Sequence, residues 1–319
     1  MPKQFISELK EGQSVDSTFS VKYKKPVSPY SKGYRFTAGL SDKTGEMEMK
    51  FWGGQDRRLV QAVFDSFRED DVVRVAGIVS MYDRRMEIHV NEGKGTVEGA
   101  KSFDVSDFVQ STRQDVGKMT AELMRAVESV GNPHIKALLV SFFGDASFAE
   151  DFRKAPAGIT MHHNYMGGLL EHTLHVLHIC MSLSEIHPAL DRDLLTAGAL
   201  LHDIGKTREF SVTTNIRQTP DGMLRGHITI GQEMLLERMA RIPSFPDELK
   251  MKIAHIVLSH HGDTEYGSPL APAFAEAEAV HYADECDAKL DQHITTRENS
   301  GTDDFRVWSR KLSRPLYVK

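Results

Sequence analysis

The sequence His202-Asp203-Ile204-Gly205-Lys206 directly follows an apolar helical pattern that runs from Leu194 to Leu201. This periodicity predicts a helix that ends at the pentapeptide, with Gly205 as the residue that stops it. An imidazole beside a carboxylate at a helix end can bind one cation while the carboxylate bridges two. The pentapeptide therefore predicts a metal site in a helical domain.

Other metal-ligand residues occur before and after this pentapeptide, on predicted helices or at their ends. The predicted ligands, in chain order, are His172, His202, Asp203, His227, His260, His261 and Asp284. This number of imidazoles and carboxylates is enough for two divalent cations. Asp203, as the bridging carboxylate, and Lys206, whose ammonium can meet a phosphate oxygen, are the predicted catalytic residues. Two cations would lower the pKa of a water and stabilise negative charge, which predicts phosphoester hydrolysis without a protein nucleophile.

The pattern leaves some assignments open. Either Asp284 or Asp287 can complete the site, and we favour Asp284 with Asp287 as a supporting or capping residue. His175 and His178 are expected on the helix surface or in the core, and His255 is expected as a supporting donor or a core residue. Mixed imidazole and carboxylate ligands suit manganese, cobalt, iron, nickel or zinc, and composition does not choose among them.

The first 95 residues have a different periodicity. Alternating apolar and polar residues predict five strands, with a short helix from Asp56 to Phe67 between the third and the fourth. This is the element order of an OB-fold barrel, a fold that commonly binds single-stranded nucleic acid. The predicted strands are Ser17 to Tyr23, Tyr34 to Leu40, Met47 to Trp52, Val72 to Val79 and Met86 to Val90.

Aromatic and basic residues on these strands are candidates for contacting nucleic acid. Aromatic rings can stack on bases, and lysine or arginine can neutralise the phosphate backbone. Alternating aromatic residues in a small barrel are also common in its core. The candidates are Lys22, Lys24, Lys25, Arg35, Phe36, Phe51, Trp52 and Tyr82.

Length and composition predict a multidomain chain: an N-terminal all-β OB-fold barrel followed by a C-terminal all-α helical bundle. The predicted boundaries are 1–95 for the barrel, 96–160 for a linker and helical segment, 161–295 for the catalytic domain and 296–319 for a basic tail. The net charge of −6 argues against a protein that simply coats nucleic acid. No signal peptide or membrane segment is evident, so we expect a cytoplasmic location and no membrane contact.

Several sequence segments resemble those of known protein families. Residues 161–290 resemble an HD-domain phosphohydrolase, and the whole chain resembles the YhaM-type 3'-5' exoribonucleases, which join an OB domain to an HD domain. The matching phrases are residues 161–173 (MHHNYMGGLLEHT), 202–206 (HDIGK), 258–262 (LSHHG) and 278–284 (EAVHYAD).

This resemblance implies a metal dependence of the manganese type. It also implies trimming of single-stranded RNA, or of single-stranded DNA as well, from the 3' end to nucleoside monophosphates. It assigns metal binding to His172, His202, Asp203 and Asp284, and less securely to His227, His260 and His261. The glycine after the histidine pair, where cyclic-dinucleotide phosphodiesterases have a glutamate, disfavours that class.

Two other functions compete with the exoribonuclease. The first is an HD-type phosphohydrolase acting on small nucleotides, with the OB-like domain as a scaffold. The second is a non-catalytic adaptor, which the complete set of ligands disfavours. Whether the chain forms a homo-oligomer is left open by the sequence.

Overall fold

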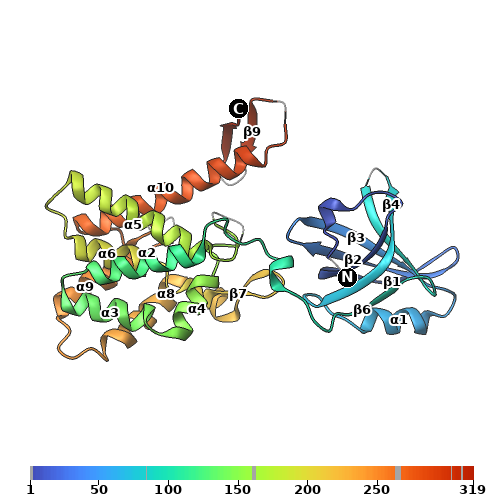
Figure 1. The fold of residues 1–319 in the computed structure, drawn as a ribbon, viewed down its shortest axis with the longest axis horizontal. Coiled ribbons are helices and arrows are strands. Elements are labelled where there is room, and N and C mark those ends of the chain that lie inside the picture. Colours follow the sequence, from blue (N-terminus) through green and yellow to red (C-terminus); the bar gives the residue numbers. More distant parts are fainter. Residues whose placement is uncertain (1–2, 84, 160–162, 263–266, 303, 310–311) are drawn as a thin grey trace. The chain divides into compact units, whose positions relative to one another are not determined.

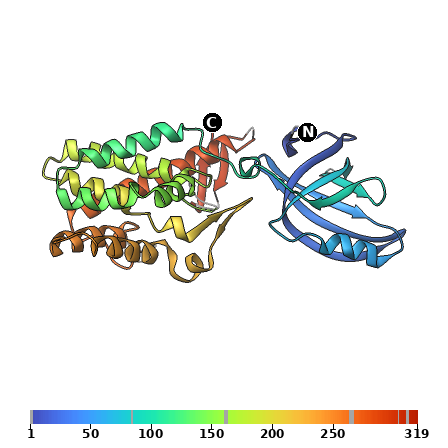
Figure 2. The ribbon, with the colours of Figure 1, turned by 60° about the horizontal axis from the view of Figure 1, so that its bottom comes forward.

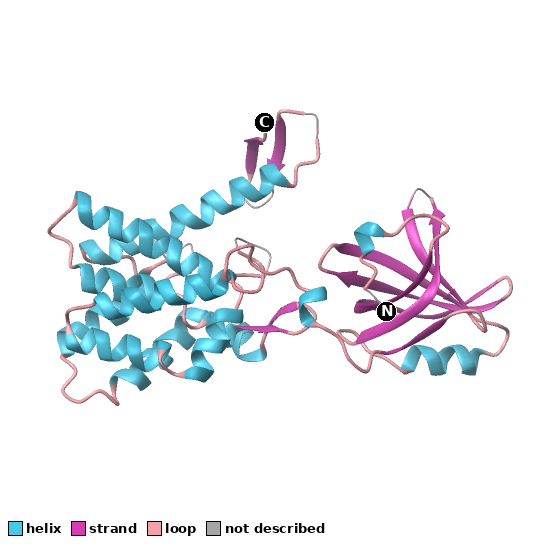
Figure 3. Cartoon of the chain, in the orientation of Figure 1, coloured by secondary structure: helices cyan, strands magenta, loops and turns pink. Residues whose placement is uncertain are grey.

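The computed structural model describes residues 3–83, 85–159, 163–262, 267–302, 304–309 and 312–319. The chain divides into two compact units, each with its own hydrophobic core. The first unit comprises Met1–Gln110 together with Thr213–Asn215, and the second comprises Ser111–Val212 and Ile216–Lys319. Strands dominate the first unit and helices dominate the second (Figure 3), which confirms the predicted combination of an all-β domain with an all-α domain.

The first unit is a closed barrel, visible in Figure 2. Strand β1 pairs antiparallel with both β2 and β4, while β3 pairs in parallel with β5. The helix α1 (Arg57–Asp65) follows the third strand, with Asp56 as its N-cap. The predicted OB-fold is confirmed. Its strands are β1 (Ser14–Tyr30), β2 (Gly33–Asp42), β3 (Gly45–Trp52), β4 (Val72–Tyr82) and β5 (Arg85–Asn91).

The barrel unit continues beyond the predicted boundary at residue 95. A sixth strand, β6 (Thr96–Gly99), pairs antiparallel with β4 and buries Val97. The glycines around it predicted a linker, but Gly95 serves a close contact: a Cβ there would overlap the carbonyl oxygen of Ala76 on β4. The short helices η1 (Ile6–Glu8) and η2 (Val105–Asp107) also belong to this unit.

The second unit is a bundle of helices around a single core (Figure 1). The helices α5 and α6 are buried along much of their length, because apolar residues fall on several of their faces, whereas α10 is buried mainly between Ala277 and Asp287. The short strands β7 (Phe210–Val212) and β8 (Ile216–Gln218) form a hairpin after α7. The helices are α2 (Val116–Ser129), α3 (Pro133–Phe143), α4 (Ala146–Lys154), α5 (Gly168–Ile186), α6 (Arg192–Leu201), α7 (Lys206–Glu209), α8 (Pro220–Met239), α9 (Asp247–Ser259) and α10 (Ala275–Glu298).

The C-terminal segment is folded, where a basic tail was predicted for residues 296–319. Helix α10 runs on to Glu298, and the chain then forms a hairpin of β9 (Arg306–Ser309) and β10 (Arg314–Tyr317). Leu316 and Val318 are buried, so the apolar residues between the basic ones hold the segment in place. Arg310 and Lys311, part of the predicted basic tail, and Met161 and His162, part of the 161–173 phrase, lie outside the described residues.

No helix in the described part of the chain combines the length and the apolar character needed to span a bilayer. Cys180 and Cys286 are both free thiols.

Candidate metal centre

The pentapeptide at 202–206 forms the tight connection between α6 and α7. His202 continues the helical backbone of α6 as its C-cap, and Asp203 follows with only 2% of its surface exposed. Helix α6 ends at the pentapeptide as predicted, but at Leu201, and Gly205 (φ −63°, ψ −22°) is the N-cap of α7 rather than the residue that stops α6. A Cβ at Gly205 would overlap the carbonyl oxygen of His227 and lie 2.7 Å from the nitrogen of Gly231. Glycine is therefore required because α8 passes close to this backbone.

A first cluster of ligand atoms forms on one side of Asp203. His172 Nε2 of α5 lies 3.2 Å from His202 Nε2 and 3.1 Å from Asp284 Oδ1 of α10. Asp203 Oδ2 lies 3.5 Å from His172 Nε2 and 3.3 Å from His202 Nε2. Four ligand atoms from α5, α10 and the α6 end thus converge on one point.

A second cluster forms around the other oxygen of the same carboxylate. Asp203 Oδ1 lies 3.5 Å from His227 Nε2 and 3.5 Å from His260 Nε2. His261 offers a further nitrogen within 4.8 Å of these atoms. Asp203 therefore faces both clusters, which is the arrangement expected of a carboxylate that bridges two cations.

Backbone breaks bring the ligands of the second cluster together. Gly226 (φ 70°, ψ 155°) interrupts α8 immediately before His227. At the end of α9, His260 keeps a helical backbone while Gly262 has φ +79°, so the chain leaves the helix at the histidine pair. The rings of His260 and His261 lie 4.3 Å apart at 70°, and both can face Asp203.

Hydrogen bonds at Nδ1 orient four of the imidazoles. His202 and His260 each lie 2.8 Å from a carbonyl oxygen of their own helix, at Ala199 and Val257. His172 Nδ1 lies 2.7 Å from Asp287 Oδ2, and His227 Nδ1 lies 2.9 Å from Glu209 Oε2. Because each Nδ1 is held by an oxygen, Nε2 is the ring nitrogen that faces the site, as in histidines that bind metals.

The hydrogen bonding of the buried atoms in the two clusters indicates whether cations can bind there. Both oxygens of Asp203, together with Nε2 of His227 and of His260, have no hydrogen-bond partner among the described residues. Asp203 Oδ2 does lie 2.6 Å from Lys206 Nζ, an ion pair outside hydrogen-bond geometry. Buried acceptors without donors are strongly unfavourable, and cations bound between them would satisfy all four at once. The residues present therefore fit divalent metals.

The surrounding charges give the two clusters different proton affinities. Burial lowers the pKa of His172, but its hydrogen bonds with Asp284 and Asp287 outweigh this and raise the pKa to about 9. Burial lowers the pKa of His261 to about 3 and also lowers that of His260. Burial opposes ionisation of Asp203, yet Lys206 and His202 hold its pKa well below the ordinary value. The carboxylate is thus charged, and two imidazoles of the second cluster are neutral.

Asp287 lies behind the first cluster. Its carboxylate accepts hydrogen bonds from His172 Nδ1 (2.7 Å), His163 Nε2 (2.9 Å) and His175 Nδ1 (2.8 Å). It therefore orients the His172 ring, while Asp284 faces the cluster directly. Asp287 also forms a further group of possible metal ligands with His163 and His172, so both aspartates remain candidates.

Sequence reasoning assigned no role to His163 or Glu209. His163 contacts Asp287, which in turn orients the predicted ligand His172. Glu209 contacts Nδ1 of the predicted ligand His227 directly. Glu209 falls on α7 three residues after Lys206, and this spacing was the available signal. By contrast, His178 pairs with Glu122 at the surface, and His255 accepts from the backbone nitrogen of Ala273, away from the clusters.

Two of the predicted nucleic-acid contacts in the barrel are wrong. Phe36 and Phe51 are 1% and 4% exposed and stack on each other in the barrel core, with ring centroids 5.0 Å apart. Phe51 and Trp52 are neighbours on one strand, so only one of them can face outward.

The predicted lysines are largely engaged within the barrel. Lys22 and Lys25 pair with Glu46 and Glu48 at 3.3 Å and 3.0 Å. Lys24 donates to backbone carbonyls near the end of α1. These contacts neutralise or occupy the ammonium groups, which leaves less charge for a phosphate backbone.

An outward group of rings with Arg35 beside one of them remains on the barrel, whereas the neighbouring Lys50 is 13% exposed and pairs with Glu87 at 2.7 Å. The Arg35 guanidinium lies 5.1 Å from the Trp52 ring, and Lys50 Nζ lies 4.6 Å from the ring of Tyr82, which is 63% exposed. His89 adds an edge contact to Trp52 at 5.7 Å. Arg35, Trp52 and Tyr82 therefore remain candidates for stacking with bases.

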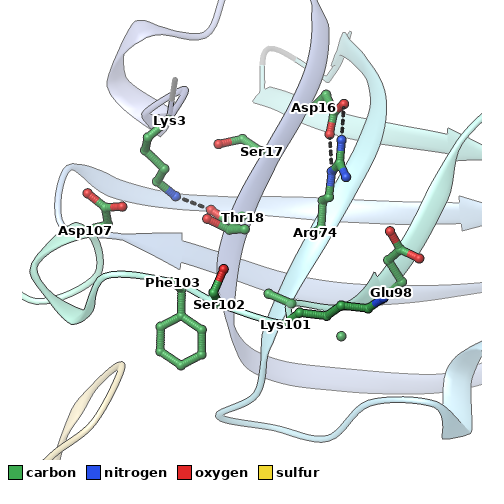
Figure 4. A pocket seen from close by; sticks show the side chains of 12 residues that line it. Lys3, Asp16, Ser17, Thr18, Arg74, Glu98, Lys101, Ser102, Phe103 and Asp107 are labelled. Carbon is green, nitrogen blue, oxygen red and sulfur yellow. Dashed lines mark hydrogen bonds and ion pairs between the residues drawn. The ribbon is translucent and has the colours of Figure 1, made fainter. Parts of the chain in front are cut away.

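A cavity of about 530 Å³ in the barrel unit contains none of the predicted residues. Figure 4 shows three of its charged groups engaged: Arg74 donates two hydrogen bonds to Asp16, at 2.7 Å and 2.8 Å, and Lys3 donates to the carbonyl oxygen of Thr18. The cavity is lined by both acidic and basic residues, so its charge favours neither an anionic nor a cationic ligand.

The fold and the two clusters define an HD-domain phosphohydrolase joined to an OB domain. Residues 169–289 match the HD domain, and residues 20–94 match an OB-fold nucleic acid binding domain. The chain is 33% identical over 286 residues to the 3'-5' exoribonuclease YhaM of Shouchella clausii (strain KSM-K16), covering 89% of this chain and 86% of that protein. The chain belongs to the YhaM family of 3'-5' exoribonucleases.

Solved OB domains also align with the barrel. The second OB-fold domain of replication protein A from Methanococcus maripaludis aligns with 32% of this chain and 99% of its own, at 20% identity and a TM-score of 0.26. Pot1pC of Schizosaccharomyces pombe, solved with single-stranded DNA, aligns with 33% of this chain and 90% of its own, at 13% identity and a TM-score of 0.26.

Proposed function

We propose that this chain is a metal-dependent 3'-5' exoribonuclease that hydrolyses single-stranded RNA to nucleoside monophosphates. The observation that carries the proposal is the buried Asp203 carboxylate, whose two oxygens face two separate sets of imidazoles. The similarity to YhaM along most of the chain supports the polarity and the substrate class. We expect a cytoplasmic location, and sedimentation would measure whether the chain forms a homo-oligomer.

Most residues of the site would bind the cations, and Lys206 would compensate negative charge. His172, His202 and Asp284 would hold one cation, and His227, His260 and His261 a second, with Asp203 shared between them. Bound divalent cations would supply Lewis-acid stabilisation of negative charge and acidify a water. Lys206 lies 2.6 Å from Asp203 and is buried, so its ammonium balances the carboxylate and can meet a phosphate oxygen that enters the site. Manganese is the metal we expect, since imidazole-rich sites suit transition metals better than magnesium.

Single strands would be captured on the outward group of the barrel. Trp52 and Tyr82 offer ring faces, and Arg35 lies beside one of them. Stacking on such rings tolerates any base, as an exonuclease that degrades a strand of arbitrary sequence requires. The choice between RNA and DNA depends on contacts with the 2'-hydroxyl, which leave no short motif.

A single comparison tests the function. Metal-stripped protein is reloaded with manganese and supplied with RNA labelled at the 3' end, the same RNA labelled at the 5' end, the matching DNA, or free nucleotides. We expect labelled mononucleotide to appear at once from the 3'-labelled RNA, while the 5' label stays on progressively shorter strands. Rapid hydrolysis of free nucleotides with intact RNA would instead establish a small-nucleotide phosphohydrolase.

Two histidines on neighbouring helices supply a matched pair of variants. His202→Ala removes a proposed ligand, whereas His178→Ala removes a surface imidazole that pairs with Glu122. Only the first should abolish release of nucleotides. Equal loss in both variants would mean that the activity depends on general stability rather than on the two clusters.

A further inference from the structure

The C-terminal hairpin has one buried face and one exposed face. In its register Arg306 pairs with Tyr317, and Trp308 pairs with Pro315. Paired residues in an antiparallel ladder point to the same side, and alternate residues point to the other. On the inner side Ser309 and Leu316 are buried, so this side is the one that packs against the protein.

The outer side has an unusually high density of exposed rings. Trp308 is 61% exposed and Tyr317 is 71% exposed. Phe305, just before β9, is 57% exposed, and its ring centroid lies 6.3 Å from that of Tyr317. Large apolar side chains gathered in this way on a surface mark an interaction site more often than they fulfil a structural role.

The net charge around these rings is positive, although Asp304, whose carboxylate accepts a hydrogen bond from the backbone nitrogen of Arg306, directly precedes Phe305. Residues 306–319 contain five basic residues and no acidic residue. Arg306 lies on the outer face itself, and Lys319 ends the chain two residues after Tyr317. This differs from the barrel, where cross-strand glutamates neutralise Lys22 and Lys25. Rings together with a net positive charge complement a strand that offers bases and phosphates.

We propose that this outer face, defined by Phe305, Arg306, Trp308 and Tyr317, is a second binding surface for single-stranded nucleic acid. Bases stack on Trp308 and Tyr317, and Arg306 and Lys319 neutralise the adjacent phosphates. A second copy of the same face fits less well, because contact between two such faces would bring like charges together. This inference rests on the proposed function in one respect only: the exoribonuclease activity identifies the bound strand as the substrate.

The hairpin is connected to the metal centre by a single helix. Helix α10 carries Asp284 in the first cluster and continues to Glu298 before the hairpin begins. At about 1.5 Å per residue, this part of the helix is about 21 Å long. Figure 1 shows the outer end of α10 and the hairpin standing clear of the other helices of the bundle. A strand must therefore be several nucleotides long to reach both the hairpin and the metal centre.

Fluorescence of Trp308 tests binding directly. The chain has two tryptophans, so Trp52→Phe leaves Trp308 as the only one and keeps an aromatic ring in the barrel. The full chain in chelator, where no hydrolysis occurs, is titrated with a long single strand or with inorganic polyphosphate. We expect the strand to quench Trp308, and polyphosphate, which has charge but no bases, to quench it much less. Binding of the strand without quenching would overturn the proposal.

The second experiment measures affinity by anisotropy of a labelled strand, again in chelator. Trp308→Ala and Tyr317→Ala should each weaken binding about tenfold, within the range of one base stacked on one ring. Met251→Ala, which truncates a 64% exposed apolar residue on α9, should have no effect. Arg306→Ala with Lys319→Ala should reduce the dependence of affinity on salt.

Three outcomes separate this inference from the proposed function. With manganese, the ring variants should turn over a small phosphodiester at the wild-type rate, since that substrate is too short to reach the hairpin. Quenching of Trp308 by a protein that hydrolyses no RNA would retain the surface and reject the exoribonuclease. Unchanged affinity, together with dissociation of an oligomer in the ring variants, would show a self-association surface and overturn the proposal.

Discussion

At the scale of single residues, Asp203 decides the chemistry. An ionised carboxylate that is 2% exposed and has no hydrogen-bond donor is tolerated only next to positive charge. Lys206 provides one such charge at 2.6 Å from Oδ2. Oδ1 instead faces two imidazole nitrogens at 3.5 Å, which can share a cation with it.

Asp203→Asn should abolish catalysis without unfolding the chain. The amide keeps the shape of the side chain but removes the charge shared by both clusters, a loss of several kcal/mol of charge stabilisation. We expect the rate of nucleotide release to fall by at least about 1000-fold, while unfolding of the metal-free protein stays cooperative at a midpoint lowered by the loss of the ion pair with Lys206. Near-normal turnover of this variant in manganese would show that the proposed site is wrong.

His172 makes metal binding dependent on pH. Its pKa of about 9 means that it carries an extra proton at neutral pH in metal-free protein, and a cation can bind only after this proton leaves. Metal affinity of the first cluster should therefore rise with pH until about 9 and then level off. Calorimetry in two buffers of different ionisation enthalpy should detect proton release. Affinity that stays constant over this range without proton release would contradict the assignment of His172 as a ligand.

At the scale of elements, the contact between α7 and α8 positions His227. Gly205 lies against the carbonyl oxygen of His227, and Glu209 on α7 holds the Nδ1 of the same residue at 2.9 Å. The short helix thus fixes the place and the rotation of one ligand of the second cluster.

Gly205→Ala should displace α8 and weaken the second metal more than the first. Forcing a methyl group into this contact is expected to cost about 1–3 kcal/mol of unfolding free energy, because backbone atoms must move. Gly99→Ala, where a Cβ meets nothing within 4 Å, is the control. Metal analysis after limited chelation would show the selective loss. Full retention of both ions by the Gly205 variant would mean that α8 adjusts without moving His227.

A comparison of the predicted and observed helices and strands shows which site residues could be predicted from the sequence. The sequence allowed the prediction of four ligands: His172, His202, Asp203 and Asp284. Histidine and aspartate are seldom found in this order on the faces and ends of successive helices unless they bind metal. Phe36 and Phe51 were misassigned because alternation separates two faces of a strand without saying which one is the core. The role of His163 and the exposed face of the C-terminal hairpin depend on contacts between distant segments, which local spacing does not contain.

At the scale of the whole molecule, each unit has its own core and the metal centre lies entirely in the second. Deletion of residues 1–110 should therefore spare hydrolysis of a small phosphodiester while reducing cleavage of long RNA at low concentration. Binding of a long strand grows with the number of phosphates and bases engaged, whereas the metal centre engages one phosphate. Deletion of residues 1–95 alone would remove β4 and leave its partner strand β6 unpaired on the shortened chain.

Kinetics on the two substrates, measured at several salt concentrations, would check this division. The intact chain should lose affinity for long RNA as salt rises, with little change for the small substrate. If the shortened chain degraded long RNA with the same affinity and the same salt dependence, the barrel would be a scaffold rather than a capture domain.

The central claim is that one carboxylate, Asp203, unites two cations in a single hydrolytic centre. It is tested most directly by adding manganese stepwise to metal-free protein while counting bound ions and recording release of the 3'-terminal nucleotide in the same samples. The account predicts little turnover with one ion per chain and full turnover when two are bound. Full turnover with a single ion, or in the metal-free protein, would contradict it.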